Sequence, residues 1–280
     1  MRRGLVTSVR VREVLVLQGT PAAALLLSLD RARSPDLASA ALVGLASLLL
    51  VAAIWTFNDW ADFSADRADA SRRPSASRGA LLGQSAALLA ASAAPCAFLP
   101  APTRALAALI AVLGVAYSAR AKGIPVAGSL LHLIGGLAHF LMASSVWVPV
   151  DARSVELGLF FALVFTAGHG IQEVQDHAAD LRAGVRTNAV AFGARPVFLA
   201  ACALFGAAYA DLLGLCAAGL FPAPVAAVAL VALPLQLAWS RGVLAGGLAA
   251  GDVARLRDRY RALFALIGLA MAAGTLFHSR

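Results

Sequence analysis

The chain is organised as long apolar segments separated by shorter polar ones. The apolar runs are roughly 17 to 25 residues long, so each is sufficient to cross a bilayer as a helix. The pattern predicts nine such helices, at residues 13–29, 37–57, 79–99, 104–118, 125–148, 155–172, 189–213, 222–240 and 259–277. We therefore expect an all-α, polytopic membrane protein that forms a single integral-membrane domain over residues 1–280.

The composition excludes an ordinary soluble protein. Hydrophobic residues make up 60% of the chain and charged residues only 14%, whereas soluble domains contain about a quarter of charged residues. The first apolar run lacks a small-residue cleavage site at its end, so we expect no cleavable signal peptide. Cys96, Cys202 and Cys216 lie in apolar runs without the spacing of a zinc or redox motif, and we expect buried free thiols.

The 23 Lys and Arg residues are distributed unevenly between the two sides of the membrane. With nine spans, 18 of them fall on the side of the N-terminus and 5 on the other side. The positive-inside rule predicts this asymmetry for a cytoplasmic N-terminus. Topology therefore explains the net charge of +8, and we expect no nucleic-acid partner. The abundance of Ala, Arg and Gly is typical of a GC-rich bacterial genome, so we expect the bacterial inner membrane.

A cluster of charged residues follows the second apolar run, in the stretch FNDWADFSADRADASRRP at residues 57–74. Asn58, Asp62 and Asp66 are spaced i, i+4 and i+8, which places them on one face of a helix. Charges at a membrane boundary are costly unless they pair or bind a ligand. Taken alone, however, such a cluster is also consistent with a solvated loop.

A second cluster with the same spacing follows the sixth apolar run. Gln172, Asp176 and Asp180 repeat the i, i+4, i+8 pattern, with Glu173 one position further round the helix. The predicted topology puts both clusters at the cytoplasmic ends of their helices. Two facing sets of carboxylates provide the hard oxygen ligands that suit Mg²⁺, whose coordination is commonly completed by substrate phosphates. The sequence thus predicts a magnesium site with its mouth on the cytoplasmic side.

Basic residues accompany both clusters. They are Arg67, Arg72, Arg73, Lys122, Arg182 and Arg186. Cationic side chains bind the free oxygens of a phosphorylated ligand. Acids that hold a metal and bases that hold phosphate together predict a diphosphate-binding site.

These motifs resemble those of the UbiA-type intramembrane prenyltransferase superfamily. Its first signature, Asn-x-x-x-Asp-x-x-x-Asp followed by Arg-Pro, is matched by Asn58, Asp62, Asp66, Arg73 and Pro74. Its second, Asp-x-x-x-Asp followed by Gly and Thr, is matched by Asp176, Asp180, Gly184 and Thr187. Between them, the family's Tyr-Ser pair and nearby Lys are matched by Tyr117, Ser118 and Lys122. The resemblance extends from about residue 10 to residue 277.

The resemblance implies nine helices around a central cavity, in which two Mg²⁺ ions hold an isoprenyl diphosphate. The implied metal ligands are Asn58, Asp62, Asp66, Asp176 and Asp180, and we add Glu173 as a further candidate. The implied diphosphate-binding residues are Arg67, Arg73, Lys122 and Tyr117, and we add Arg12. Catalytic roles are implied for Asp62, Asp66, Asp176, Asp180, Lys122 and Tyr117. The expected partners are the prenyl diphosphate, a lipophilic acceptor and membrane lipid.

The implied reaction transfers an isoprenyl group to an aromatic, quinone-precursor or other lipophilic acceptor through an allylic carbocation. Some members of the superfamily instead cyclise the prenyl chain without an acceptor, as terpene synthases. No residue here indicates a carboxylate-binding pocket for a hydroxybenzoate, so the sequence leaves both reactions open. A transporter or scaffold with acidic gates is a third interpretation, but both acidic motifs lie at the membrane edge rather than at its midplane.

Three histidines lie within or at the ends of predicted spans: His132, His139 and His169. A histidine in a membrane can act as a base or position an acceptor, or it can serve in hydrogen-bonded packing. The sequence leaves these alternatives open. It also assigns no role to the extra acids Asp59 and Asp69.

Overall fold

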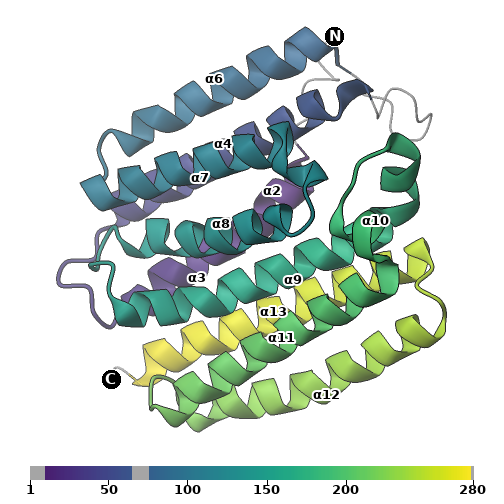
Figure 1. The fold of residues 1–280 in the computed structure, drawn as a ribbon. Coiled ribbons are helices and arrows are strands. Elements are labelled where there is room, and N and C mark those ends of the chain that lie inside the picture. Colours follow the sequence, from purple (N-terminus) through teal and green to yellow (C-terminus); the bar gives the residue numbers. More distant parts are fainter. Residues whose placement is uncertain (1–9, 65–75, 279–280) are drawn as a thin grey trace.

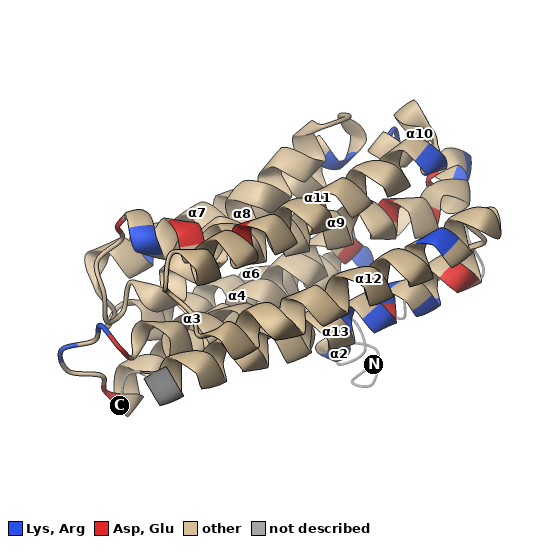
Figure 2. Cartoon of the chain, turned by 90° about the horizontal axis from the view of Figure 1, so that it is seen from below, with Lys and Arg blue, Asp and Glu red and all other residues tan. Residues whose placement is uncertain are grey.

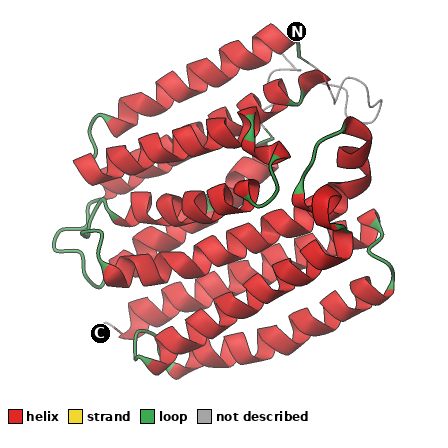
Figure 3. Ribbon diagram, in the orientation of Figure 1, coloured by secondary structure: helices red, strands yellow, loops and turns green. Residues whose placement is uncertain are grey.

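The computed structural model describes residues 10–64 and 76–278, and these residues form helices joined by turns and loops (Figure 1, Figure 3). Within the described ranges, nine segments are long and apolar enough to cross a membrane. The predicted all-α fold with nine spans is therefore confirmed. The first span, Val11–Ser28, consists of two helices because the helix is interrupted at Gln18.

The helices of the described chain have clear bounds. In chain order they are α2 (Val11–Leu17), α3 (Gly19–Ser28), α4 (Leu37–Ala61), α6 (Arg78–Cys96), α7 (Ala101–Ala119), the 3₁₀ helix η1 (Ala121–Gly123), α8 (Ala127–Ser144), α9 (Ala152–Ala183), α10 (Asn188–Phe192), α11 (Ala194–Ala217), α12 (Ala223–Ala245) and α13 (Ala250–His278). The sequence predicted α9 and α13 too short, because hydropathy does not register the polar ends of these helices.

The length of α9 explains where the second acidic cluster lies. Its 32 residues extend over about 48 Å at 1.5 Å per residue, whereas the apolar layer of a bilayer is about 30 Å thick. The first part of the helix is therefore sufficient to cross the membrane. The last three turns, which carry the cluster, extend beyond the apolar layer as a continuous helix.

Ion pairs and a capping box fix the opposite end of α9. Asp151 accepts a hydrogen bond from Ser154 N–H, and Ser154 Oγ accepts one from Asp151 N–H, which caps the first turn. The guanidinium of Arg31 pairs with Asp151, and its hydrogen bond holds the pKa of that carboxyl well below its usual range. Arg153 lies 2.5 Å from Asp30. These contacts join the α3–α4 loop to the start of α9.

The central helices of the bundle are α8 and α9 (Figure 1). α8 packs against α3, α7 and α9, while α9 packs against α8, α11 and α13. α6 packs on α4 at one edge, and α12 packs on α11 and α13 at the other. α9 is thereby held by helices from both halves of the chain.

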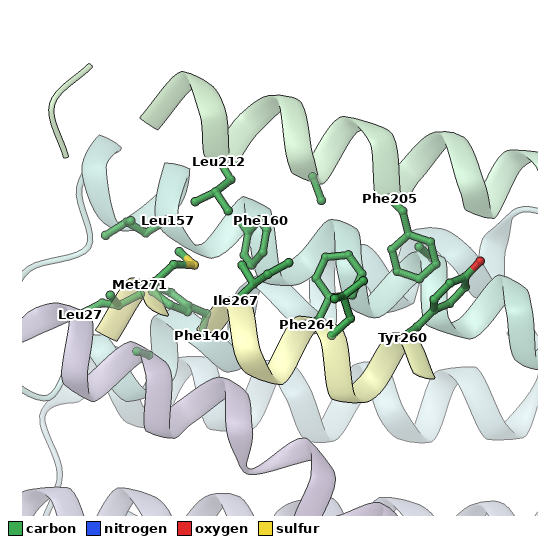
Figure 4. Close-up of a cluster of buried hydrophobic side chains, with 14 of the residues drawn as sticks. Leu27, Phe140, Leu157, Phe160, Phe205, Leu212, Tyr260, Phe264, Ile267 and Met271 are labelled. Atoms are coloured by element: carbon green, nitrogen blue, oxygen red, sulfur yellow. The ribbon is translucent and has the colours of Figure 1, made fainter. Parts of the chain in front are cut away.

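A cluster of aromatic and aliphatic side chains fixes α9 against its neighbours (Figure 4). Phe140 of α8, Phe160 of α9 and Phe205 of α11 are at most 3% exposed. The Phe205 and Phe264 rings stack with centroids 5.1 Å apart, which brings α13 into the same cluster. Packing of large aromatic groups is strongly favourable and leaves little freedom for a helix to rotate.

Charged residues gather toward the two ends of the bundle, and the middle of the helices is almost free of them (Figure 2). This distribution is expected for helices whose central parts lie in hydrocarbon, where a charge is costly. Together with the nine apolar spans, it identifies the chain as an integral membrane protein.

Candidate active site

A polar cavity of about 410 Å³ lies among the ends of α2, α4, α7, α8, α9 and α13. Both predicted acidic clusters line it. The first contributes Asn58 and Asp62, and the second contributes Gln172, Glu173, Asp176 and Asp180. Two motifs that lie far apart in the sequence therefore face the same space.

The first cluster lies at the C-terminal end of α4, where Asn58 belongs to the last turn and Asp62 is the C-cap residue, so the helix that was predicted to continue through Asp62 ends at Ala61. Asn58 Nδ2 donates to Asp62 Oδ2 at 3.0 Å, and Lys122 Nζ of η1 lies 2.7 Å from the same oxygen. Ser118 Oγ at the end of α7 donates to Asn58 Oδ1 at 3.4 Å. α7 and η1 therefore both orient this cluster. The predicted site residues that lie outside the described ranges are Asp66, Arg67 and Arg73.

Asp59, to which the sequence assigned no role, has a structural partner. Arg10 Nη2 lies 2.5 Å from Asp59 Oδ1, and the guanidinium lies over the Trp55 ring at 5.1 Å from its centroid. These contacts tie the start of α2 to the end of α4. They close one wall of the polar cavity, to which Arg10 and Trp55 both contribute.

The second cluster lies on the polar extension of α9. The turn that follows this helix adds Thr187 to the same wall of the cavity. Gly184 adopts a left-handed conformation with φ 69°, and the following N–H of Val185 donates to Asp180 O at 3.0 Å. A glycine is favoured at such a helix end because it has no Cβ to clash. The turn reverses the chain and returns Thr187 to the cavity.

Asn188 holds the second cluster against α8. Its Oδ1 accepts a hydrogen bond from Val126 N–H at 2.6 Å, and its Nδ2 donates to Glu173 Oε1 at 3.2 Å and to Ser129 Oγ at 3.1 Å. Val126 has φ 69°, a conformation that is unfavourable for a β-branched residue. Asn188 therefore both supports a strained backbone and orients a carboxylate of the cavity.

The oxygens that face the cavity fit a divalent cation. Glu173 Oε2 and Thr187 Oγ1 are buried and make no hydrogen bond to the described part of the chain. Mg²⁺ prefers oxygen donors, and it usually takes one or two protein carboxylates together with water and substrate phosphates. Among residues 10–64 and 76–278, no three His, Cys, Asp or Glu side chains converge into a complete metal cage. The donor set is thus suited to a metal whose shell the ligand completes.

An apolar cavity of about 140 Å³ adjoins the polar one. Its aliphatic and aromatic walls include Val51, Ile54, Ile110, Leu113 and Phe165. The residues that line both cavities are Trp55, Asn58, Tyr117 and His132. A ligand with an anionic head and an apolar tail can therefore place its head at the acidic clusters, through a bound divalent cation, and its tail among the aliphatic side chains.

Three rings meet at the junction of the two cavities. The His132 and His169 rings stack with centroids 3.7 Å apart, and Tyr117 meets His132 edge-on at 4.6 Å. Gly128 permits this approach, because a Cβ there would lie 3.3 Å from Tyr117 Cε2. His169 Nε2 lies 3.1 Å from Glu173 Oε1, although no hydrogen bond to the described residues forms at this nitrogen.

Most of the predicted site residues within the described ranges meet at the polar cavity. These are Asn58, Asp62, Tyr117, Lys122, Glu173, Asp176 and Asp180. Arg12 does not line it, because its exposed guanidinium lies 3.3 Å from Asp258 on the surface of α13.

Sequence reasoning missed Arg257, which reaches the polar cavity from α13. Its Nε is buried and makes no hydrogen bond within the described residues, whereas the neighbouring Arg259 lies over the Trp239 ring. The spacing of the apolar residues Val253 and Tyr260, which the structure buries, could have indicated the inward face of α13. Arg257 lies on that face, four residues after the first and three before the second.

Residues 19–247 match the sequence profile of the UbiA prenyltransferase family. The chain belongs to this family. The resemblance predicted from the two acidic motifs is thereby confirmed, and family membership supports prenyltransferase activity in general terms. A comparison with curated protein sequences finds no match.

Solved structures share the fold at low sequence identity. A structure of digeranylgeranylglyceryl phosphate synthase in membranes has a TM-score of 0.75 and 18% identity, with 98% of each chain covered. A UbiA homologue from Archaeoglobus fulgidus, bound to GPP and Mg²⁺, has a TM-score of 0.67 and 17% identity, with coverage of 94% of this chain and 98% of the homologue. A UbiA homologue from Aeropyrum pernix K1 has a TM-score of 0.63 and 22% identity, with coverage of 95% and 97%.

Proposed function

We propose that this UbiA-family protein transfers an isoprenyl group from a prenyl diphosphate to an aromatic, quinone-precursor or other lipophilic acceptor. The observation that carries the proposal is the pairing of two cavities. Acids from α4 and α9 surround a polar cavity, which shares four wall residues with an apolar cavity. An isoprenyl diphosphate has the same division into an anionic head and an apolar tail.

We assign the head group to a site that contains Mg²⁺. The proposed metal ligands are Asn58, Asp62, Asp66, Asp176 and Asp180, with Glu173 as a further ligand, and two ions are expected. The Archaeoglobus fulgidus homologue was solved with GPP and Mg²⁺ and with DMAPP and Mg²⁺, which supports this assignment. When bound, the metal supplies positive charge that stabilises the departing diphosphate.

The chain's own cations share that task. Lys122 approaches the cavity from η1 and Arg257 from α13, and we propose that both bind oxygens of the diphosphate as it leaves. Arg67, Arg73 and the Tyr117 hydroxyl are proposed to bind the same group. Charge-assisted hydrogen bonds strengthen as negative charge builds up on the leaving group, so they favour ionisation.

The junction of the cavities suits the allylic cation that ionisation produces. Trp55 and Tyr117 present aromatic rings there, and aromatic faces attract a cation. The apolar walls beyond them exclude water, which would otherwise capture the cation. An acceptor bound beside the rings then forms the new bond.

We further propose that the N-terminus and the mouth of the polar cavity face the cytoplasm of a bacterial cell, across its inner membrane. The distribution of 18 basic residues on one side and 5 on the other supports this orientation. The substrate head would then enter from the cytoplasm and the tail from the lipid.

The proposal is tested with the purified protein in lipid nanodiscs. Geranyl, farnesyl and geranylgeranyl diphosphates are supplied with Mg²⁺, with and without a panel of phenolic acceptors, while diphosphate release and organic products are measured. Asp62→Asn and Asp176→Asn are compared with Asp252→Asn, a control at a half-exposed ion pair with Arg255. The two site variants are expected to lose at least 100-fold in rate, and the control to retain the wild-type rate.

Each outcome separates the alternatives. Metal-dependent product that requires an acceptor supports the transferase. A cyclic hydrocarbon or alcohol from the diphosphate alone assigns the protein to the terpene synthases of the superfamily. Full activity in both site variants contradicts the assignment of the acids, and the absence of any product from all three donors favours a transporter or scaffold.

A further inference from the structure

His132 occupies the point at which the charged and the apolar parts of the site meet. It belongs to the small group of residues that line both cavities, on the early part of α8. Its ring is held on two sides, by face-to-face stacking on His169 at 3.7 Å and by the edge of Tyr117 at 4.6 Å. The ring therefore has a fixed orientation beside the position at which the prenyl cation forms.

The hydrogen bond of His132 determines which of its nitrogens carries the proton. Nδ1 lies 2.8 Å from the carbonyl oxygen of Gly128. A carbonyl oxygen only accepts, so Nδ1 must be the donor, and in the neutral ring the lone pair is on Nε2. Nε2 makes no hydrogen bond to the described residues. It is also not one of the side-chain atoms that are both fully buried and without a partner, so it is accessible from the cavity. A basic nitrogen is thus left open at the cavity junction.

The other groups at the junction do not offer such a nitrogen. The indole of Trp55, the amide of Asn58 and the phenol of Tyr117 have no basic lone pair at neutral pH. The carboxylates of the polar cavity are the proposed metal ligands, apart from Glu13, which pairs with Arg261 at 2.6 Å. Lys122 is paired with Asp62.

His139 and His169 do not line both cavities, because His139 lines only the apolar cavity and His169 only the polar one. His139 Nε2 lies 2.7 Å from Ser47 Oγ, whose hydroxyl donates to Gln18 Oε1 at 2.8 Å. His139 must therefore donate through Nε2, and it serves to join α8 to α4 and to the α2–α3 junction. His169 lies beside Glu173 in the second acidic cluster.

We propose that His132 is the catalytic proton acceptor of the reaction, an assignment that rests on the proposed function. Ionisation breaks the allylic C–O bond, and its electron pair leaves with the diphosphate. The acceptor supplies the electron pair of the new bond to the prenyl carbon, so the adduct carries one positive charge. Nε2 takes a proton from the adduct, which gives a neutral product and an imidazolium, and the imidazolium returns the proton to water.

The same nitrogen serves when no acceptor is present. A prenyl or cyclised cation that loses a proton to Nε2 becomes an alkene, whereas a cation captured by water becomes an alcohol. The ratio of alkene to alcohol therefore reports on the base independently of ionisation.

The test uses the full-length protein in nanodiscs with Mg²⁺ and geranyl diphosphate. His132→Asn is the variant of choice, because its amide N–H can replace Nδ1–H at the Gly128 carbonyl while the basic nitrogen is removed. Diphosphate release is expected to fall less than about tenfold, whereas formation of deprotonated products falls by about a hundredfold, the usual contribution of a general base. Those products are the alkene and, with a phenol that the wild type prenylates, the prenylated phenol.

A second variant keeps the proposal testable if His132→Asn folds poorly. In His132→Ala, added imidazole is expected to restore the deprotonated products, which a purely structural role of the ring would not allow. An unchanged ratio of alkene to alcohol in His132→Asn, or the absence of rescue in a folded His132→Ala, overturns the proposal. A wild type that releases no diphosphate overturns the proposed function itself, whereas an active wild type with unaffected variants overturns only the role of His132.

Discussion

The contact network of Asn188 provides a sharp test of how the site is built. One side chain joins the start of α8 to the second acidic cluster, through the Val126 N–H, Ser129 Oγ and Glu173 Oε1. Asn188→Ala removes all three hydrogen bonds and leaves the strained residue Val126 without its acceptor. We therefore expect the substitution to lower both the free energy of unfolding and the affinity for metal and diphosphate.

The magnitude of the Asn188→Ala effect follows from the partners that are lost. Val126 is half-exposed, so water can replace the lost acceptor of its N–H and this loss costs about 1 kcal/mol, whereas the lost hydrogen bond to the charged and buried Glu173 costs about 1.5–3 kcal/mol. Water entering the polar cavity offsets part of the second loss, because Glu173 faces that cavity. The expected net destabilisation is about 2–3 kcal/mol, which lies at the upper end of the about 0.5–3 kcal/mol that most substitutions cost.

Two measurements test this prediction. The first is equilibrium unfolding of the purified protein in mixed micelles, and the second is the rate of diphosphate release as a function of Mg²⁺ concentration. Ser129→Ala is the matched comparison, because it removes only one of the three contacts, and it should cost about 1 kcal/mol. If Asn188→Ala unfolds like Ser129→Ala and needs no more Mg²⁺ than the wild type, the supporting role of Asn188 is refuted.

Three further predictions concern the head group, the tail and the opposite end of the bundle. Arg257→Ala should raise the KM for a prenyl diphosphate about tenfold to a hundredfold, which corresponds to the loss of one charged hydrogen bond. An equal effect of Arg259→Ala would refute a specific role of Arg257 in diphosphate binding. Gly135 lines the apolar cavity, and a Cβ there would meet open space, so Gly135→Leu should lower turnover of geranylgeranyl diphosphate relative to geranyl diphosphate; an unchanged ratio would place the tail elsewhere. The hydrogen bond from Arg31 lowers the pKa of Asp151. The bond therefore stabilises the fold fully above the unfolded carboxyl pKa of about 3.9, and this stabilisation is lost as pH falls below that value. Arg31→Ala should accordingly reduce the unfolding free energy at neutral pH and have progressively less effect below about pH 4.

The periodic features of the sequence predicted most of the architecture. Nine apolar runs predicted nine spans, because each run is a local property that the bilayer selects by length and hydropathy. The spacing of Asn58 and Asp62, and of Asp176 and Asp180, predicted acidic faces that line a common cavity. The polar ends of α9 and α13 were the exception, since hydropathy alone does not separate a polar helix from a loop.

The family, the fold class and the acidic character of the site were thus determined by the sequence alone. The tertiary structure decided which further residues join them. Arg257 reaches the cavity because α13 packs on α9, and His132 stacks on His169 because α8 packs on α9. Gly128 leaves room for Tyr117 beside this pair. Helix periodicity determines the face on which a side chain lies, but the neighbour that this face meets depends on the packing of all the helices together.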